Sequence, residues 1–185
     1  MGTDFERRLK HMKNSSLLIL VAMLLLLSCA SRTYHPQSPL VEIDGEKMLV
    51  GPVVFTDLLH YFPDWNTVFQ QADVPDEIVQ QIQAIDRSLT IRIFIGTWCG
   101  DSRDGVPPFM KILQQAKNVH LKIELIGVDR QKLDPDGLAI DYHIERVPTF
   151  IILENGSEIG RMVEFPKKTF AEDLLDLVAQ SNDDE

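Results

Sequence analysis

One stretch in the middle of the chain decides the fold: Leu89-Thr90-Ile91-Arg92-Ile93-Phe94-Ile95-Gly96-Thr97-Trp98-Cys99-Gly100-Asp101-Ser102. Residues 89–95 are mostly β-branched and apolar and end at Gly96, which is typical of a buried strand. A helical pattern follows from about residue 102 to residue 117, interrupted by Pro107-Pro108. The loop between these two elements therefore places Cys99 close to the start of a helix.

The segments that follow alternate between strand and helix patterns. The expected elements are a strand over residues 121–128, a short helix over 138–142, strands over 150–154 and 158–164, and an amphipathic helix over 168–180. Asn155-Gly156 joins the last two strands, because both residues tolerate the positive φ of a tight hairpin turn. This order predicts an α/β domain over residues 89–181, with a mixed central sheet flanked by helices on both sides.

Residues 41–88 are expected to form an N-terminal extension packed on this domain. Asp44-Gly45 predicts a hairpin over residues 40–50. Pro63-Asp64 and Pro75-Asp76 separate helical patterns near residues 55–61, 65–72 and 75–86. The extension could cover either an edge of the sheet or the groove beside Cys99.

Two separated motifs resemble the thioredoxin family. Trp98-Cys99-Gly100 is similar to the family's active-site loop, and Tyr142-His143-Ile144-Glu145-Arg146-Val147-Pro148-Thr149-Phe150 is similar to the segment that carries its cis-proline. The resemblance covers residues 89–180 and implies a thioredoxin-like fold with a cis Val147–Pro148 bond. It also implies that the backbone of Val147 faces Cys99 and pairs with an extended substrate, while Trp98 shields one flank. An ordinary trans turn at Pro148 and a packed Trp98 are the alternatives.

Cys99 is the candidate nucleophile. Unpaired N–H groups and the positive end of the dipole at a helix start both favour a thiolate over a thiol. The carboxylate of Asp101 opposes this effect, whereas the hydroxyl of Ser102 and the guanidinium of Arg103 can offset it. Cys99, Ser102 and Asp101 are therefore the predicted catalytic residues, and Trp98, Val147 and Pro148 the predicted substrate-binding residues.

The motif departs from the thioredoxin pattern at three positions. Ser102 replaces the resolving cysteine, so that a mixed disulfide on Cys99 must await an external thiol. Ile93 stands in place of a buried aspartate, and Asp101 in place of a proline. These departures favour monothiol thiol–disulfide exchange with protein thiols, disulfides or a low-molecular-weight thiol. The alternative is a redox-inactive binding or assembly module that uses the groove around Trp98 and Pro148; peroxide reduction has less support, because no peroxidatic loop precedes Cys99.

The N-terminus has the pattern of an export signal. Basic residues at positions 7–13 precede the apolar run Leu17–Leu27, and the run leads to Ser28-Cys29. This order resembles the lipobox of bacterial lipoproteins, which implies a signal peptide over residues 1–28, lipidation of Cys29 and a tether over 29–40. The protein is then lipid-anchored in a bacterial cell envelope, with its domain facing the periplasm or the exterior. An uncleaved helical anchor and ordinary secretion are the alternatives.

Composition limits the classes of partner and cofactor. The 185 residues carry 18 basic and 28 acidic side chains, and the net charge of -10 argues against nucleic acid and anionic lipid surfaces as partners. Cys29 and Cys99 are the only two cysteines, which excludes a disulfide-rich scaffold and a zinc site made of several thiolates. The histidines show no ligand spacing. The sequence therefore predicts neither a metal site nor a cofactor.

Overall fold

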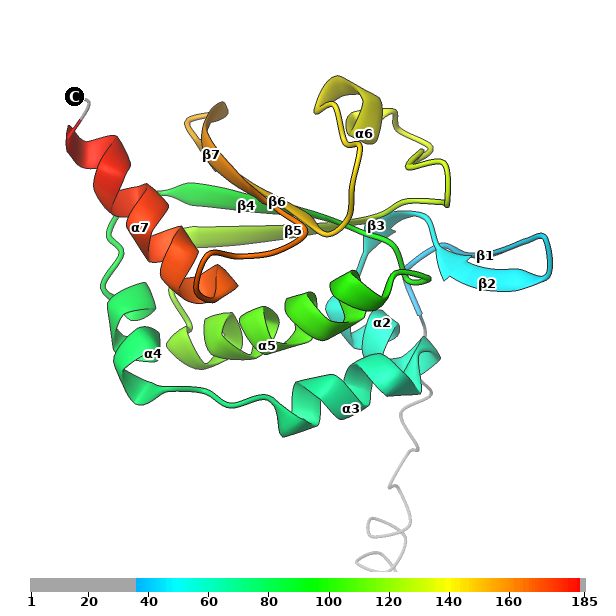
Figure 1. Cartoon of the computed structure of the whole chain (residues 1–185), viewed down its shortest axis with the longest axis horizontal. Helices are drawn as coiled ribbons and strands as arrows, with labels where there is room; N and C mark the ends of the chain where they lie inside the picture. The colour runs from blue at the N-terminus through cyan, green and yellow to red at the C-terminus, as the bar shows by residue number, and fades with distance from the viewer. Residues whose placement is uncertain (1–35, 184–185) are drawn as a thin grey trace, which may run out of the picture. The chain divides into compact units, whose positions relative to one another are not determined.

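The computed structural model of the chain describes residues 36–183, and its centre is a mixed five-stranded sheet (Figure 1). The strand order is β3-β5-β4-β6-β7. The strands are β3 (Gly51–Val53), β4 (Leu89–Ile95), β5 (Leu121–Gly127), β6 (Thr149–Glu154) and β7 (Ser157–Val163). Strand β4 pairs in parallel with β5 and antiparallel with β6. The strand that leads to Cys99 therefore occupies the middle of the sheet.

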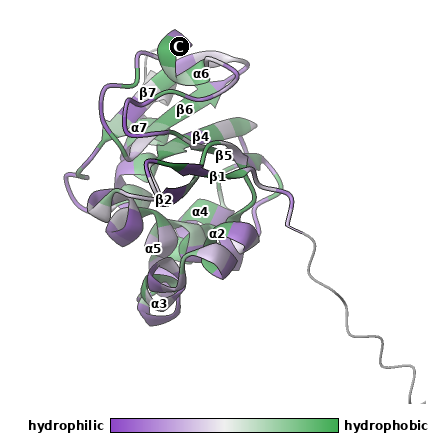
Figure 2. Cartoon of the chain, turned by 90° about the vertical axis from the view of Figure 1, so that its right-hand side faces the viewer, coloured by the Kyte–Doolittle hydropathy of each residue, from purple (hydrophilic) through white to green (hydrophobic). Residues whose placement is uncertain are grey.

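Both faces of β4 are buried, which explains its nearly continuous apolar sequence. Ile91, Ile93 and Ile95 point to one cluster of buried side chains, and Phe94 points to a second cluster on the opposite face. Strands β4 and β6 themselves consist largely of hydrophobic residues, as the hydropathy view shows (Figure 2). The sheet thus separates two hydrophobic layers, and each of them needs helices to cover it.

Helices cover the two faces of the sheet unequally (Figure 1). The larger cluster packs beneath five helices: α2 (Phe55–Tyr61), α3 (Pro63–Gln71), α4 (Asp76–Gln83), α5 (Gly100–Ala116) and α7 (Phe170–Asp183). The smaller cluster packs beneath α6 (Leu138–Asp141). The predicted mixed sheet with helices on both sides is confirmed.

Helix α5 differs from its prediction, because it runs without interruption through Pro107-Pro108. Each proline lacks an N–H, so the carbonyl groups of Arg103 and Asp104 receive no helical hydrogen bond. Asp104 is exposed and Arg103 is half-exposed, so both residues lie next to solvent. Pro107 is itself buried against the core. The helix therefore continues at these positions because exposure limits the cost of the two missing bonds and burial of the ring adds packing.

The predicted hairpin is formed by β1 (Leu40–Ile43) and β2 (Glu46–Leu49), with positive φ at both Asp44 and Gly45. The end of β2 lies against the central sheet. A Cβ at Gly127 would overlap the carbonyl oxygen of Leu49, and the N–H of Leu49 donates to the Thr97 hydroxyl at 3.4 Å. The hairpin therefore contacts the loop that carries Cys99.

Strand β3 is an edge strand that no pattern in the sequence predicts. Its three residues pair antiparallel with β5, with Gly51 opposite Gly127. It lies inside the predicted extension, which also supplies Leu58, Trp65 and Ile82 to the larger buried cluster. The segment over 41–88 and the segment over 89–181 thus share one core.

The described residues 36–183 form one compact unit. All described strands and helices, and both clusters of buried side chains, belong to this unit, which accordingly contains its whole core and is expected to fold by itself. None of the helices within residues 36–183 has the length and apolar character needed to cross a membrane. The predicted signal peptide and Cys29 lie outside the described residues.

Candidate functional site

The loop from Gly96 to Ser102 connects the end of β4 to the start of α5. Cys99 is the N-cap residue of α5, and its N–H donates to the carbonyl of Gly96 at 2.9 Å. The fully buried hydroxyl of Ser102 accepts a hydrogen bond from the N–H of Gly96 at 3.3 Å. A Cβ at Gly96 would come within 2.6 Å of the Trp98 ring, so this position requires glycine. These contacts fix Cys99 at the end of the sheet.

The thiol of Cys99 faces the loop that precedes β6. Its Sγ donates to the carbonyl oxygen of Val147 at 3.2 Å, and the Val147–Pro148 peptide bond is cis. The carbonyl of Pro148 accepts from the N–H of Glu164 at 2.8 Å, which attaches this loop to the chain after β7. The structure therefore brings three of the predicted site residues together: Cys99, Val147 and Pro148.

Trp98 is half-buried beside Cys99. Its indole N–H donates to the carbonyl of Val128 at 3.1 Å. The guanidinium of Arg130 lies 5.1 Å from the ring centroid and the ammonium of Lys132 lies 5.9 Å from it, both within the range of a cation–π interaction. Arg130 is also hydrogen-bonded to Glu46, which raises the pKa of its guanidinium. The indole is thus packed on one side and covered by cations on another.

A hollow of about 230 Å³ opens next to Cys99. Its wall comes partly from the loop, including Trp98 and Arg103, and partly from the junction of α2 and α3 over residues 61–65. Sequence reasoning missed residues 61–65 as part of the site. Pro63-Asp64 indicated a helix start there, but no local signal indicated which surface the two helices face.

The surroundings of Cys99 differ from the sequence prediction in two ways. No hydrogen bond within the described part of the chain joins Ser102 to the sulfur, because the serine hydroxyl is turned toward Gly96. Arg103 is paired with Asp104 at 2.8 Å, and this hydrogen bond raises the pKa of the guanidinium. Both groups expected to stabilise the thiolate are therefore engaged with other partners.

Asp101 is exposed and lines a different, larger groove along α5 instead of the hollow beside Cys99. Its predicted catalytic role stays a prediction. Across residues 36–183, no three His, Cys, Asp or Glu side chains lie close enough together to hold a metal ion.

The fold, together with a cysteine at a helix start opposite a cis-proline, defines a thioredoxin-like domain. A family model described as thioredoxin matches residues 60–176, and the chain belongs to the thioredoxin family. The matched region begins inside α2, so it includes most of the helical part of the predicted extension.

Relatives in plants are similar to this chain over about half of its length. The chain is 30% identical over 104 residues to a thioredoxin H-type of Fagopyrum esculentum, covering 56% of this chain and 75% of the relative. It is 29% identical over 101 residues to thioredoxin H9 of Arabidopsis thaliana, covering 52% of this chain and 66% of the relative.

Solved structures show the same fold at low sequence identity. An HIV epitope-scaffold superimposes with a TM-score of 0.55 and 15% identity, covering 71% of this chain and 94% of that one. A protein of unknown function from Pseudomonas aeruginosa superimposes with a TM-score of 0.51 and 17% identity, covering 73% of this chain and 84% of that one.

The Arg103–Asp104 pair gives a prediction about the reactivity of Cys99. Replacing Asp104 with Asn removes the carboxylate that is hydrogen-bonded to the guanidinium of Arg103 and leaves only the weaker interaction with Asp64, so more positive charge acts at the rim of the hollow and the thiolate is stabilised. We expect alkylation of Cys99 by iodoacetamide at pH 7 and low salt to become about twofold faster, the size of an exposed charge interaction. The double variant Arg103→Gln/Asp104→Asn is the control and should show no such gain. An equal gain in the double variant would show that Arg103 is not its source.

Proposed function

We propose that this protein performs thiol–disulfide exchange with a single thiol, that of Cys99. The observation that carries the proposal is the position of this cysteine at the start of α5, with its sulfur 3.2 Å from the carbonyl oxygen of Val147 beside a cis-proline. Membership in the thioredoxin family supports the same chemistry, since a thioredoxin-like fold is compatible with thiol–disulfide exchange.

The reaction has two steps, and the electrons balance without a further oxidant. The Cys99 thiolate attacks one sulfur of a substrate disulfide, a new S–S bond forms, and the other sulfur leaves as a thiolate that takes up a proton. An external thiol then attacks the mixed disulfide, because Ser102 has no sulfur with which to resolve it. Cys99 is regenerated, and the substrate has exchanged one thiol partner for another.

The contact with Val147 links ionisation of Cys99 to substrate binding. In the thiol form, Cys99 donates to the carbonyl of Val147. Loss of the thiol proton removes this donor, and the carbonyl is then available to an N–H of an extended substrate strand. Trp98 bounds the site beside the same sulfur. Protein disulfides, whose flanking chain can adopt an extended form, are thus the proposed substrates, along with low-molecular-weight thiols.

The proposal places the domain on the outer side of a bacterial membrane, held by a lipid on Cys29. Its support is the order of basic residues, apolar run, Ser28 and Cys29 in the sequence. Several acyl chains on one cysteine give lasting attachment, whereas a single chain binds membranes only marginally.

A disulfide reagent tests the monothiol mechanism. Residues 31–185, which lack Cys29, should release a single equivalent of thionitrobenzoate from 5,5′-dithiobis(2-nitrobenzoate) and keep the other half as an adduct on Cys99 until glutathione is added. The variant Ser102→Cys should release a second equivalent and lose the adduct, because a cysteine three positions along the helix can attack the mixed disulfide. Mass spectrometry of the intact protein distinguishes the two products.

The variant Ser157→Cys provides the matched control, since it places the second cysteine at the exposed start of β7. It should carry two adducts and keep both. A folded wild-type protein whose Cys99 forms no adduct would contradict the proposal and favour the alternative of a binding module that uses the surface around Trp98 and Pro148.

Lipidation is tested with the full chain produced in a bacterium that processes lipoproteins. We expect labelled palmitate in the protein and recovery in the membrane fraction, and we expect Cys29→Ala to remove the label. Cys99→Ala is the control and should keep it. Membrane recovery without label would instead indicate an uncleaved helical anchor.

A further inference from the structure

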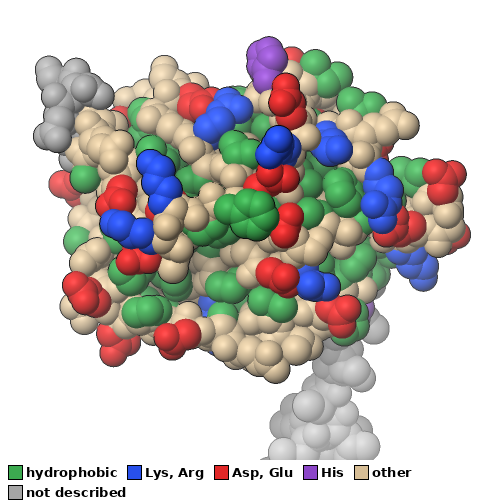
Figure 3. Space-filling model, viewed as in Figure 1, with side chains coloured by type: hydrophobic (Ala, Val, Ile, Leu, Met, Phe, Trp, Pro, Cys, Tyr) green, Lys and Arg blue, Asp and Glu red, His purple; other side chains and the backbone are tan. Residues whose placement is uncertain are grey.

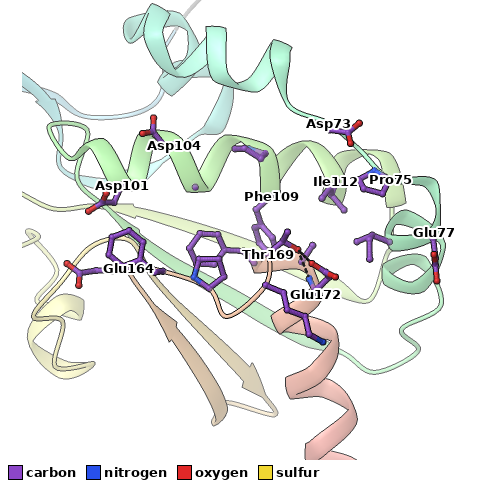
Figure 4. A pocket seen from close by; sticks show the side chains of 18 residues that line it. Asp73, Pro75, Glu77, Asp101, Asp104, Phe109, Ile112, Glu164, Thr169 and Glu172 are labelled. Carbon is purple, nitrogen blue, oxygen red and sulfur yellow. Dashed lines mark hydrogen bonds between the residues drawn. The ribbon is translucent and has the colours of Figure 1, made fainter.

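A second concave surface lies along α5, apart from the hollow beside Cys99 (Figure 4). It has a volume of about 740 Å³ and lies between α5, the start of α7, the segment before α4 and the segment after β7. Phe109, Ile112 and Phe170 form its apolar floor. Phe165 stands on its wall with 69% of its surface exposed. We call this surface the α5 groove.

The rim of the α5 groove is strongly acidic. Six carboxylates line it: Asp73, Glu77, Asp101, Asp104, Glu164 and Glu172. Asp101, Asp104 and Glu164 lie at one end and Asp73 and Glu77 at the other, with Phe109 and Ile112 between them (Figure 4). The space-filling view shows hydrophobic side chains on this face with acidic side chains around them (Figure 3). Charge and apolar surface therefore alternate along the groove.

Within residues 36–183, most of these carboxylates form no ion pair. Asp104 pairs with Arg103, and Glu164 pairs with Arg146. The other four carboxylates form no ion pair within residues 36–183. Lys168 is the cation among the lining residues, and it pairs with Asp176, outside the groove, while its charge also interacts more weakly with Glu172. The unpaired carboxylates include members at both ends, Asp101 and Asp73.

We propose that the α5 groove binds a polypeptide segment with apolar side chains in its middle and lysine or arginine at both ends. Residues 101 and 112 of α5 are separated by about 16 Å at 1.5 Å per helical residue, so the groove spans roughly three turns of helix. A small monovalent cation can satisfy only one end of such a rim. A polypeptide segment buries its apolar side chains on the floor and places cations at both carboxylate clusters.

The position of the α5 groove puts this segment next to the redox site. Asp101 follows Cys99 by two residues, and the N–H of Glu164 donates to the carbonyl of Pro148. Binding itself requires no thiol chemistry. It can therefore be measured in the Cys99→Ser variant, where its success or failure is independent of the proposed exchange reaction.

The test is fluorescence anisotropy with residues 31–185 carrying Cys99→Ser. The probe is a labelled peptide of about 12 residues, enough for three turns of helix, with leucine and phenylalanine in the middle and lysines at both ends. One reference peptide has glutamates in place of the lysines, and another has serines in place of the apolar residues. We expect the probe to bind saturably and both reference peptides not to bind. We also expect binding of the probe to weaken as salt is added.

Two variants locate the binding to the groove. Asp73→Asn/Glu77→Gln/Asp101→Asn removes exposed carboxylates from both ends, and it should weaken binding about fivefold at low salt, as expected for three exposed charge pairs. Its matched control, Glu42→Gln/Asp136→Asn/Asp141→Asn, removes equal charge from exposed positions elsewhere and should change nothing. Phe165→Ser should weaken binding about fivefold through lost apolar contact. Ile140→Ser, at a side chain 63% exposed beside the other face of the sheet, is its control.

Three results would overturn the proposal. The first is equal binding of the glutamate peptide, and the second is equal weakening by the control variants. The third is self-association of the protein, seen by sedimentation and abolished by Phe165→Ser, without competition from the lysine peptide. That third result would assign the groove to a second copy of this chain.

Discussion

The hydrogen bond between the N–H of Gly96 and the hydroxyl of Ser102 is the interaction on which the site depends. It joins the residue that directly follows β4 to the first turn of α5. Strand β4 is fixed by burial of both its faces, and α5 is fixed by its packing on the larger cluster. The bond makes these two rigid elements hold the intervening loop. Cys99, at the N-cap, is thereby kept against the carbonyl of Val147.

Ser102 has a structural role in this arrangement. A buried N–H group without a hydrogen-bond acceptor would lower the stability of the fold. The buried hydroxyl of Ser102 is the acceptor for the N–H of Gly96 at the end of β4. Ser102 thus supports the geometry of the loop but supplies no second thiol. We infer that the chain retains the means to position one reactive sulfur while resolution of the mixed disulfide is left to an external thiol.

Features set by local residues could be predicted from the sequence. The apolar run of β4 and the hairpin turns at Asp44-Gly45 and Asn155-Gly156 are examples, and all four turn residues have positive φ. The cis form of the Val147–Pro148 bond came only from the family resemblance. Features that depend on distant contacts were missed. Strand β3 is too short to show a pattern and forms because β5 offers it an edge, and residues 61–65 reach Cys99 only through the packing of α3 on α5.

The partners of the charged side chains around the site could likewise not be predicted from the sequence. Sequence proximity suggested that Arg103 acts on Cys99, but the adjacent carboxylate of Asp104 forms a closer pair with it. The two sides of α5 carry different kinds of side chain. The hollow beside Cys99 includes aromatic residues of α2 and α3, whereas the α5 groove has acidic residues at both ends. The proposed chemistry and the proposed binding of a polypeptide therefore involve neighbouring surfaces of one helix.

The most direct test of the central claim is the rate at which Cys99 exchanges with glutathione disulfide at pH 7, compared with an unstructured peptide of sequence Trp-Cys-Gly-Asp-Ser. Both thiols have the same neighbours in sequence, so the ratio of rates reports what the fold adds. We predict that residues 31–185 react about tenfold faster, because the start of a helix stabilises the thiolate that attacks. A folded protein that reacts no faster than the peptide would contradict the account.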